Sequence, residues 1–254
     1  MKFLRVGLLA GLFALLGCSL GAYADGTTGF NILKLAGNSV RWQATPNQGL
    51  IVTWGLVPEP MQFSGARNCR GMVSLDRLLA SSGLSVPEAR QEIGAAFAMW
   101  EEAANIRFRE SSDAGRANIL IGAQAEPEGW AFADVFYDTG SPEHVKPISQ
   151  SLVCLNPSKR WKIGFDGDLK IYDLRYTFAH EIGHAIGLDH PSGSGQIMGY
   201  RYDEQFRVLQ AGDRKGAVVL YGERKGNDAE IIAEPMPNAA QRPSATRAIA
   251  PPAP

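Results

Sequence analysis

The sequence lacks several features that often identify a function directly. Its 254 residues carry a formal net charge of −1, so there is no excess of positive charge of the kind that binds nucleic acid or an anionic membrane. No segment repeats, and no long run of one charge sign occurs. The only long apolar run, residues 6–17, is too short to span a bilayer comfortably. With 45% hydrophobic residues, the chain is long enough to form one globular domain with a sizeable core.

The first 24 residues have the pattern of a signal peptide. Lys2 and Arg5 form a positive start, the apolar run follows, and Ala22-Tyr23-Ala24 is a small-x-small cleavage site. We therefore expect cleavage after Ala24 and a soluble mature chain that is exported, either secreted or periplasmic. A short membrane anchor is a second interpretation of the same run.

A third interpretation concerns Cys18. It ends the stretch LLGC, which resembles a bacterial lipobox and would make the protein an outer-membrane lipoprotein. Leu16 before the glycine is a less usual lipobox residue, so cleavage after Ala24 is favoured. We expect no transmembrane segment in the mature chain.

Cysteine is scarce, with three in the whole chain. After cleavage at Ala24 only Cys69 and Cys154 remain, and an oxidising compartment permits a bond between them. The sequence therefore predicts a disulfide, although two separate buried thiols would give the same pattern.

The pattern of apolar residues predicts alternating strands and helices. Ser85 and Glu88 form a capping box that starts a long amphipathic helix with an apolar stripe. A second helix ends near Gly187, a residue suited to a left-handed cap. The strands are expected at 49–57, 106–110, 117–123, 130–137 and 149–156, and the helices at 75–80 (one turn), from 85, at 174–186 and at 211–222.

The composition and the pattern of apolar residues divide the chain into four parts. Residues 1–24 are the signal peptide, residues 25–39 a short polar lead-in, and residues 40–222 the folded domain. Residues 223–254 are rich in Pro, Ala and charge without periodicity, so we expect a flexible tail.

Histidine is also scarce, and three of the four histidines lie in the stretch FAHEIGHAIGLDH, residues 178–190. His180 and His184 are four apart and therefore lie on one face of a helix. Gly187 ends the helix and lets the chain turn back, so that His190 supplies a third nitrogen. Three imidazoles and a water suit Zn²⁺, which keeps an open position at catalytic sites.

Glu181 lies between the first two histidines and would lean over the open side of the ion. Zinc lowers the pKa of its bound water from about 15.7 toward 7, and Glu181 would act as the general base that takes the proton from this water. The other interpretation is a helix whose histidines are satisfied by hydrogen bonds. The spacing H-E-x-x-H-x-x-G-x-x-H favours the metal site, because it is the mark of a metalloprotease class.

With Gly187, His190 and the later stretch IMGY, residues 197–200, the chain resembles a metzincin zinc endopeptidase, and among these most closely the matrixins. The resemblance covers roughly residues 40–222. It implies that His180, His184 and His190 bind the zinc, that Glu181 is the general base, and that Met198 is the methionine of the Met-turn beneath the metal.

The resemblance also implies a fold and a way of binding substrate. We expect an α/β (α+β) domain with a twisted, mostly parallel sheet, one antiparallel edge strand, two long helices and a third helix in a small subdomain after His190. An extended peptide would lie along the edge strand near Trp130–Tyr137. We expect a monomer that hydrolyses peptide bonds in exported or extracellular proteins. The alternative is a zinc-stabilised binding or adhesion module that does not cleave, although such a module has no need of Glu181.

One departure from the matrixin pattern concerns metals. Matrixins usually carry a second, structural zinc, but only His144 remains to bind one here, so we expect no second zinc. Calcium has candidate ligands in loops, although solvated surface charge is the commoner explanation for most such residues: Asp113, Asp134, Asp138, Asp166 and Asp168.

Another departure is Tyr200, which stands two residues after Met198, where matrixins typically place tyrosine directly after the methionine. This spacing resembles serralysins and astacins, in which the tyrosine can approach the zinc. Tyr200 is therefore either a contact to the zinc or the oxyanion, or a residue that packs the pocket wall.

Overall fold

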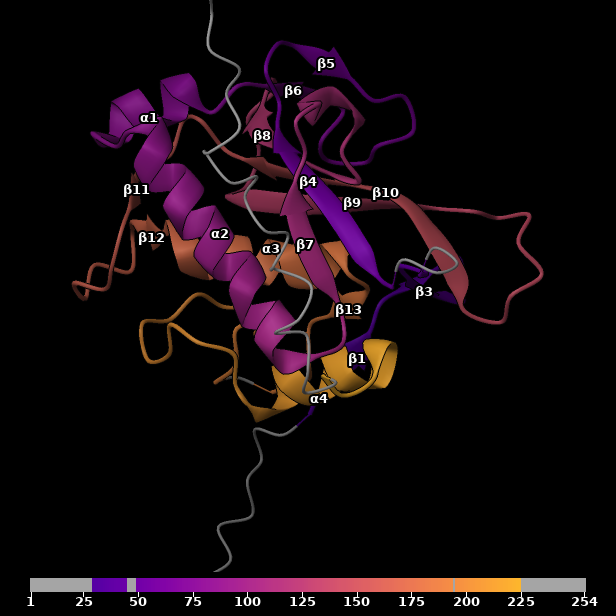
Figure 1. Cartoon of the computed structure of the whole chain (residues 1–254). Coiled ribbons are helices and arrows are strands. Elements are labelled where there is room, and N and C mark those ends of the chain that lie inside the picture. The colour runs from indigo at the N-terminus through magenta and orange to yellow at the C-terminus, as the bar shows by residue number, and fades with distance from the viewer. Residues whose placement is uncertain (1–28, 45–48, 194, 225–254) are drawn as a thin grey trace, which may run out of the picture.

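The computed structural model describes residues 29–44, 49–193 and 195–224 (Figure 1). The predicted signal peptide and nearly all of the predicted tail lie outside these residues. In the described part of the chain, no helix combines the length and the apolar character needed to cross a membrane.

Among the residues that the structure describes, nine strands form one mixed sheet, and two further pairs of short strands stand beside it. Along the main path of the sheet the order is β2-β3-β10-β8-β4-β7. The central pairs, β10 with β8, β8 with β4 and β4 with β7, are parallel, whereas β9 pairs with β10 antiparallel. The predicted mostly parallel sheet with an antiparallel edge strand is therefore confirmed. The strands are β1 (Asn31–Ile32), β2 (Lys34–Leu35), β3 (Asn38–Arg41), β4 (Ile51–Leu56), β5 (Met61–Gln62), β6 (Gly71–Val73), β7 (Arg107–Glu110), β8 (Ile119–Gln124), β9 (Ala131–Tyr137), β10 (Lys146–Leu155), β11 (Trp161–Lys162), β12 (Tyr172–Asp173) and β13 (Leu188–Asp189).

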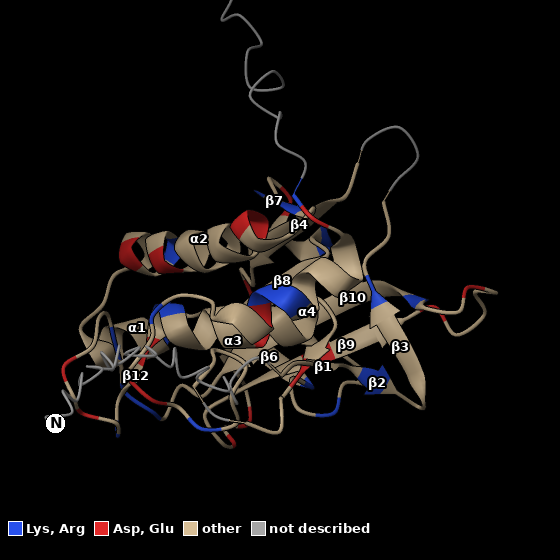
Figure 2. Cartoon of the chain, turned by 90° about the horizontal axis from the view of Figure 1, so that it is seen from below, with Lys and Arg blue, Asp and Glu red and all other residues tan. Residues whose placement is uncertain are grey.

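Two long helices pack against each other and against the sheet. Figure 2 shows α2 and α3 side by side, with positively and negatively charged residues interspersed along the chain. The Trp100 indole N–H on α2 donates to the Ala179 carbonyl on α3 at 2.9 Å, so the two helices are joined by a buried hydrogen bond. The capping box of Ser85 and Glu88 starts α2 as predicted. The helices are α1 (Asp76–Ser82), α2 (Val86–Ala103), α3 (Leu174–Ala185) and α4 (Ala211–Tyr221), with a 3₁₀ turn at Ala114–Arg116.

The central strand β8 is buried on both faces, which explains its unbroken apolar sequence. Ile119 and Ile121 belong to the main core beneath the helices. Leu120, which points the other way, packs in a second cluster with Cys69 and Cys154. The sheet is thus covered by helices on one face and by the segment around Cys69 on the other.

The predicted lead-in, residues 25–39, contains short strands where the structure describes it. β1 pairs with β13, and the β2–β3 hairpin joins the main sheet through β3 and β10. These strands are two to four residues long and mix apolar with polar residues. β1 and β3 pair with strands more than a hundred residues away, β13 and β10, which local sequence does not reveal. No strand was expected at β5 or β6, which are two and three residues long and pair Met61 with Met72 and Gln62 with Gly71.

Candidate metal centre

Three imidazole nitrogens converge at one point in the structure. The Nε2 atoms of His180 and His184, both on α3, lie 3.2 Å apart, and the Nε2 atom of His190 lies 3.1 and 3.3 Å from them. Among the described residues these three form the only group of three or more His, Cys, Asp or Glu side chains that is close enough to share a metal ion.

Backbone carbonyl groups fix the tautomer of two of the imidazole rings. His180 Nδ1 lies 2.7 Å from the Ile197 carbonyl oxygen, and His184 Nδ1 lies 2.9 Å from that of Leu188. Each Nδ1–H therefore donates to a carbonyl, and each Nε2 lone pair points at the common centre. Three nitrogens about 2.0–2.1 Å from a tetrahedral ion lie about 3.3 Å from one another. The observed separations match this arrangement, and the residues therefore fit zinc.

Burial keeps these imidazoles neutral. It lowers the pKa of all three histidines, to well below the usual 6.5 for His180 and to about 4 for His184. Neighbouring imidazoles add to the effect at His180 and His184, since protons on adjacent rings repel. Neutral imidazole is the form that binds a metal.

Glu181 is buried on α3 between the two helical ligands, and its side chain is 6% exposed where it lines the adjoining cleft. Burial raises the pKa of its carboxyl group to about 8. A bound divalent cation would lower that value, because its positive charge favours the carboxylate. The position is therefore suited to a group that takes up and releases a proton near neutral pH.

A sharp turn after α3 positions His190 beside the other two histidines. Gly187 has φ of 101°, and a Cβ at this position would lie 2.4 Å from the Val40 carbonyl oxygen, so only glycine fits. The chain then pairs as β13 with β1, and the Asn31 side-chain amide donates to the His190 carbonyl oxygen at 2.7 Å. The segment expected to be a lead-in therefore positions the third histidine.

Beneath the cluster, Met198 packs against the helix. A Cβ at Gly183 would lie 2.2 Å from the Met198 sulfur and 2.9 Å from the Trp100 ring, so the absence of a side chain lets the two segments touch. Tyr200 lies two residues further on. Its ring stands edge-on to His190 with centroids 5.1 Å apart, and its side chain is 81% exposed.

A cleft of about 990 Å³ runs past the three histidines. One wall is α3, from Tyr176 to His184, and another is the segment Gly199–Tyr202. Strand β9 forms a third wall. An aromatic stack that the sequence did not reveal also lines the cleft: Tyr172 lies 3.8 Å from Trp130 and 4.1 Å from Tyr202 between ring centroids.

The backbone of β9 has one open edge along this cleft. Among the described strands β9 pairs only with β10. The Trp130 carbonyl and the Asp138 N–H both bond toward β10. Because backbone groups alternate in direction along a strand, those of Ala131, Ala133 and Val135 face the open edge.

The candidate calcium ligands do not gather into one group among the described residues. Asp134 accepts hydrogen bonds from the backbone N–H groups of Asn68 and Cys69. Asp166 forms an ion pair with Lys162, while Asp138 and Asp168 accept N–H groups of nearby loop residues. Asp113 is 3.9 Å from Arg116. His144 is exposed and stands apart from the histidine cluster.

The fold and the histidine cluster define a metzincin-type zinc peptidase domain. The family model of the matrixins matches residues 77–222, more than half of the chain, and the protein belongs to this family. It is 27% identical to stromelysin-2 of Rattus norvegicus over 216 residues, which cover 83% of this chain and 43% of the relative. It is 29% identical to human matrix metalloproteinase-21 over 167 residues, 58% of this chain and 26% of the relative.

A serralysin from Photorhabdus laumondii is 36% identical over 93 residues, 37% of this chain and 18% of the relative. The chain thus spans less than half the length of these relatives.

Proposed function

We propose that this protein is a zinc-dependent endopeptidase. The observation that carries the proposal is the convergence of three neutral imidazole nitrogens within 3.1–3.3 Å of one another, next to a buried glutamate at the floor of an open cleft. Its membership of the matrixin family supports the same reaction. His180, His184 and His190 would hold the zinc, and Met198 would be the methionine of the Met-turn.

The chemistry is divided between the metal and the protein. When bound, zinc lowers the pKa of a coordinated water and polarises the scissile carbonyl. Glu181 accepts the proton of the attacking water, because its carboxylate is buried beside the ligands and has a raised affinity for protons. It then delivers that proton to the nitrogen of the leaving amine. The buried surroundings keep bulk water away from this transfer.

The substrate is an extended peptide that adds a strand to the open edge of β9. Ala131, Ala133 and Val135 supply backbone donors and acceptors for it, and a row of such bonds gives affinity without sequence selectivity. Alternate side chains of the peptide then enter the cleft. One set faces α3 and the aromatic stack of Trp130, Tyr172 and Tyr202.

We place the enzyme outside the cytoplasm. The signal-peptide pattern of residues 1–24 and the disulfide between Cys69 and Cys154 both favour an oxidising compartment, either the periplasm or the medium. Intact mass of the exported protein decides between a chain that starts at Asp25 and one acylated at Cys18.

The reaction is tested by separating zinc binding from hydrolysis. Glu181→Ala should keep about one zinc per chain by elemental analysis and lose nearly all hydrolysis of a peptide library. His184→Ala should lose both, because two imidazoles hold zinc far less well than three. Glu102→Gln, which removes an exposed carboxylate on α2, is the matched control. If zinc-loaded wild-type protein cleaves no peptide, the protein is a zinc-stabilised binding module instead.

A further inference from the structure

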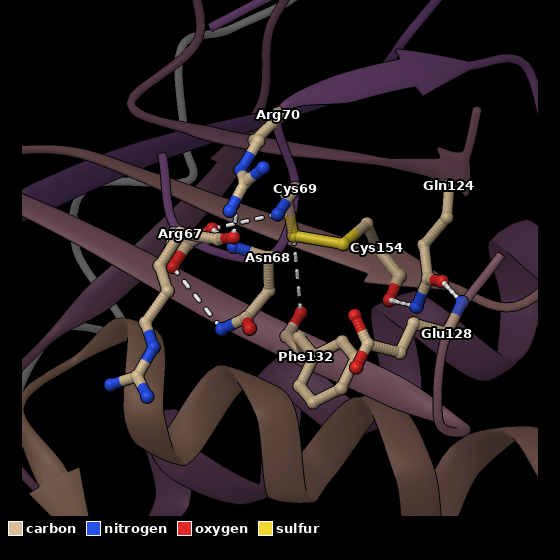
Figure 3. Close-up of a disulfide and its surroundings, with 9 residues drawn as sticks. Arg67, Asn68, Cys69, Arg70, Gln124, Glu128, Phe132 and Cys154 are labelled. Carbon is tan, nitrogen blue, oxygen red and sulfur yellow. Dashed lines mark hydrogen bonds between the residues drawn. A yellow bond between two sulfur atoms is a disulfide. The ribbon is translucent and has the colours of Figure 1, made fainter. Parts of the chain in front are cut away.

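A loop tied down by the disulfide forms the wall of the cleft opposite the helices. Residues 63–70 connect β5 to β6, and within them Cys69 is bonded to Cys154 on β10 with a Cα–Cα distance of 5.8 Å (Figure 3). The backbone N–H groups of Asn68 and Cys69 donate to the Asp134 carboxylate on β9 at 2.8 and 2.7 Å. The loop is therefore anchored to both β9 and β10.

This loop lies on the face of the sheet that α3 does not cover. Ala133 and Val135 on β9 pack toward the helices, whereas Phe132 and Phe136 pack in the cluster around the disulfide. A peptide paired with the open edge of β9 continues the pleat, so its side chains alternate between the same two faces. Every second side chain meets the metal site and α3, and those in between meet the loop.

Arg67 is the charged residue that the loop presents to those side chains. It is exposed, it lines the cleft together with Asn68 and Asp134, and it forms no ion pair with any residue that the structure describes. Figure 3 shows its guanidinium extending away from the disulfide. The Asp134 carboxylate accepts the two backbone donors and forms no ion pair with Arg67.

We propose that Arg67 is a specificity residue that selects peptides with an acidic side chain on the loop side of the bound strand, and that the Cys69–Cys154 disulfide holds it in place. The proposal rests on the proposed peptidase function for the position of the peptide. The guanidinium suits a carboxylate because it offers a planar fork of donors to two oxygens.

The experiment measures binding separately from hydrolysis. The probe is an array of peptides about ten residues long in which each position in turn is Asp, Asn or Lys, offered to zinc-loaded Glu181→Gln protein, which keeps the metal ligands and lacks the base. The protein that retains Glu181 is then tested for hydrolysis of the same peptides, which gives the ratio of kcat/KM for each Asp peptide to kcat/KM for its Asn counterpart. Each assay is run with Arg67, with Arg67→Gln and with Arg67→Glu.

Asp should be preferred to Asn by about fivefold, at positions two residues apart, and the preference should shrink as salt is raised from about 50 to 500 mM. Arg67→Gln should bring the ratio close to one, and Arg67→Glu should favour Lys at the same positions. Arg70→Gln is the matched control, because it removes the same charge from the same loop and Arg70 does not line the cleft. This variant should retain the preference for Asp.

The outcomes separate the two proposals. An unchanged preference for Asp in Arg67→Gln, or no preference with Arg67 present, would refute the role of Arg67 even if peptides are cleaved. A preference that depends on Arg67 without any cleavage would instead refute the peptidase function. The double variant Cys69→Ser/Cys154→Ser, checked for zinc content, should lose the preference in the same binding assay. Retention of the full preference there would refute the anchoring role of the disulfide.

Discussion

The carboxylate of Asp213 on α4 accepts a hydrogen bond from the backbone N–H of Met198, and a second from that of Ile197, each at 3.0 Å. A third N–H, that of Gln210, donates to the same group at 2.8 Å. Asp213 is buried, and Ile197 also holds the His180 ring through its carbonyl oxygen. One side chain on the last helix thereby fixes the turn beneath the metal site and a contact to a ligand.

We predict that Asp213→Asn destabilises the protein by about 2–3 kcal/mol, because an amide offers one acceptor oxygen and turns its NH₂ group toward a backbone donor. Urea unfolding of the zinc-free protein measures this loss. Asp76→Asn, an exposed carboxylate at the start of α1, is the control and should change stability little. Equal stability of Asp213→Asn and wild type would show that water replaces the lost acceptor.

Asn31 supports the metal site from the opposite end of the chain. Its amide bonds to the carbonyl oxygen of His190, so we predict that Asn31→Ala weakens zinc binding by about tenfold through a less ordered third ligand. Competition with a chelator measures the affinity. Asn38→Ala removes an amide that bonds only within its own hairpin turn, and should bind zinc as wild type does.

Local signals were enough to predict the helical part of the site. The capping box at Ser85, the four-residue spacing of His180 and His184, and the break at Gly187 act within one or two turns of chain. They gave the long helices from the sequence alone, while runs of apolar and β-branched residues gave strands β4, β7, β8, β9 and β10.

The supports of the site were not predictable in this way. The bonds of Asn31 to His190 and of Arg207 to Glu92 join residues 159 and 115 positions apart, and no periodicity marks them. The side of the sheet taken by the loop at Arg67 likewise depends on how distant strands pair. Such features arise from tertiary packing, which a single sequence does not display.

Arg207 bridges two buried carboxylates. It donates to Glu92 on α2 and to Asp173 at the start of α3, at distances of 2.7–3.0 Å. We predict that Arg207→Ala lowers the free energy of unfolding by about 3 kcal/mol, since it leaves buried negative charge without this partner. Arg160→Ala, on the surface, should have little effect. A chemical denaturation curve that shifts equally for both variants would contradict the bridging role.

For the zinc-free protein we predict a stability maximum near neutral pH. The lowered pKa values of the three histidines mean that below about pH 6.5 the unfolded chain binds protons that the folded state does not. Stability therefore falls as the pH falls. Glu181, with a pKa raised from 4.5 to about 8, holds a proton in the folded state that the unfolded chain has lost, so its contribution declines as the pH rises toward 8.

Melting temperatures of chelator-treated protein from about pH 5 to 9 test the decline in stability on both the acid and the alkaline side. Three histidines outweigh one glutamate on the acid side, which places the maximum at about pH 6.5–7. Glu181→Gln should lack the decline on the alkaline side. A wild-type curve that rises steadily to pH 9 would show that Glu181 is ionised in the folded state.

Tyr200 is the remaining residue whose role the spacing left open. Its ring stands edge-on to His190, which sets the phenol beside a ligand of the metal, while its high exposure leaves the ring free to turn toward the cleft. We predict that the hydroxyl donates to the oxyanion in the transition state. Tyr200→Phe keeps the ring and removes only this donor.

If the prediction is correct, kcat of Tyr200→Phe falls on the order of 10²-fold while KM stays nearly constant, because an interaction made only in the transition state is lost. Zinc content should stay at the wild-type level, which excludes loss of the metal as the cause. Tyr202→Phe is the matched control: its hydroxyl donates to Glu204 and accepts from the Asp173 N–H, away from the three imidazoles. A Tyr200→Phe enzyme within about twofold of wild type in kcat would place Tyr200 in the pocket wall, as a packing residue only.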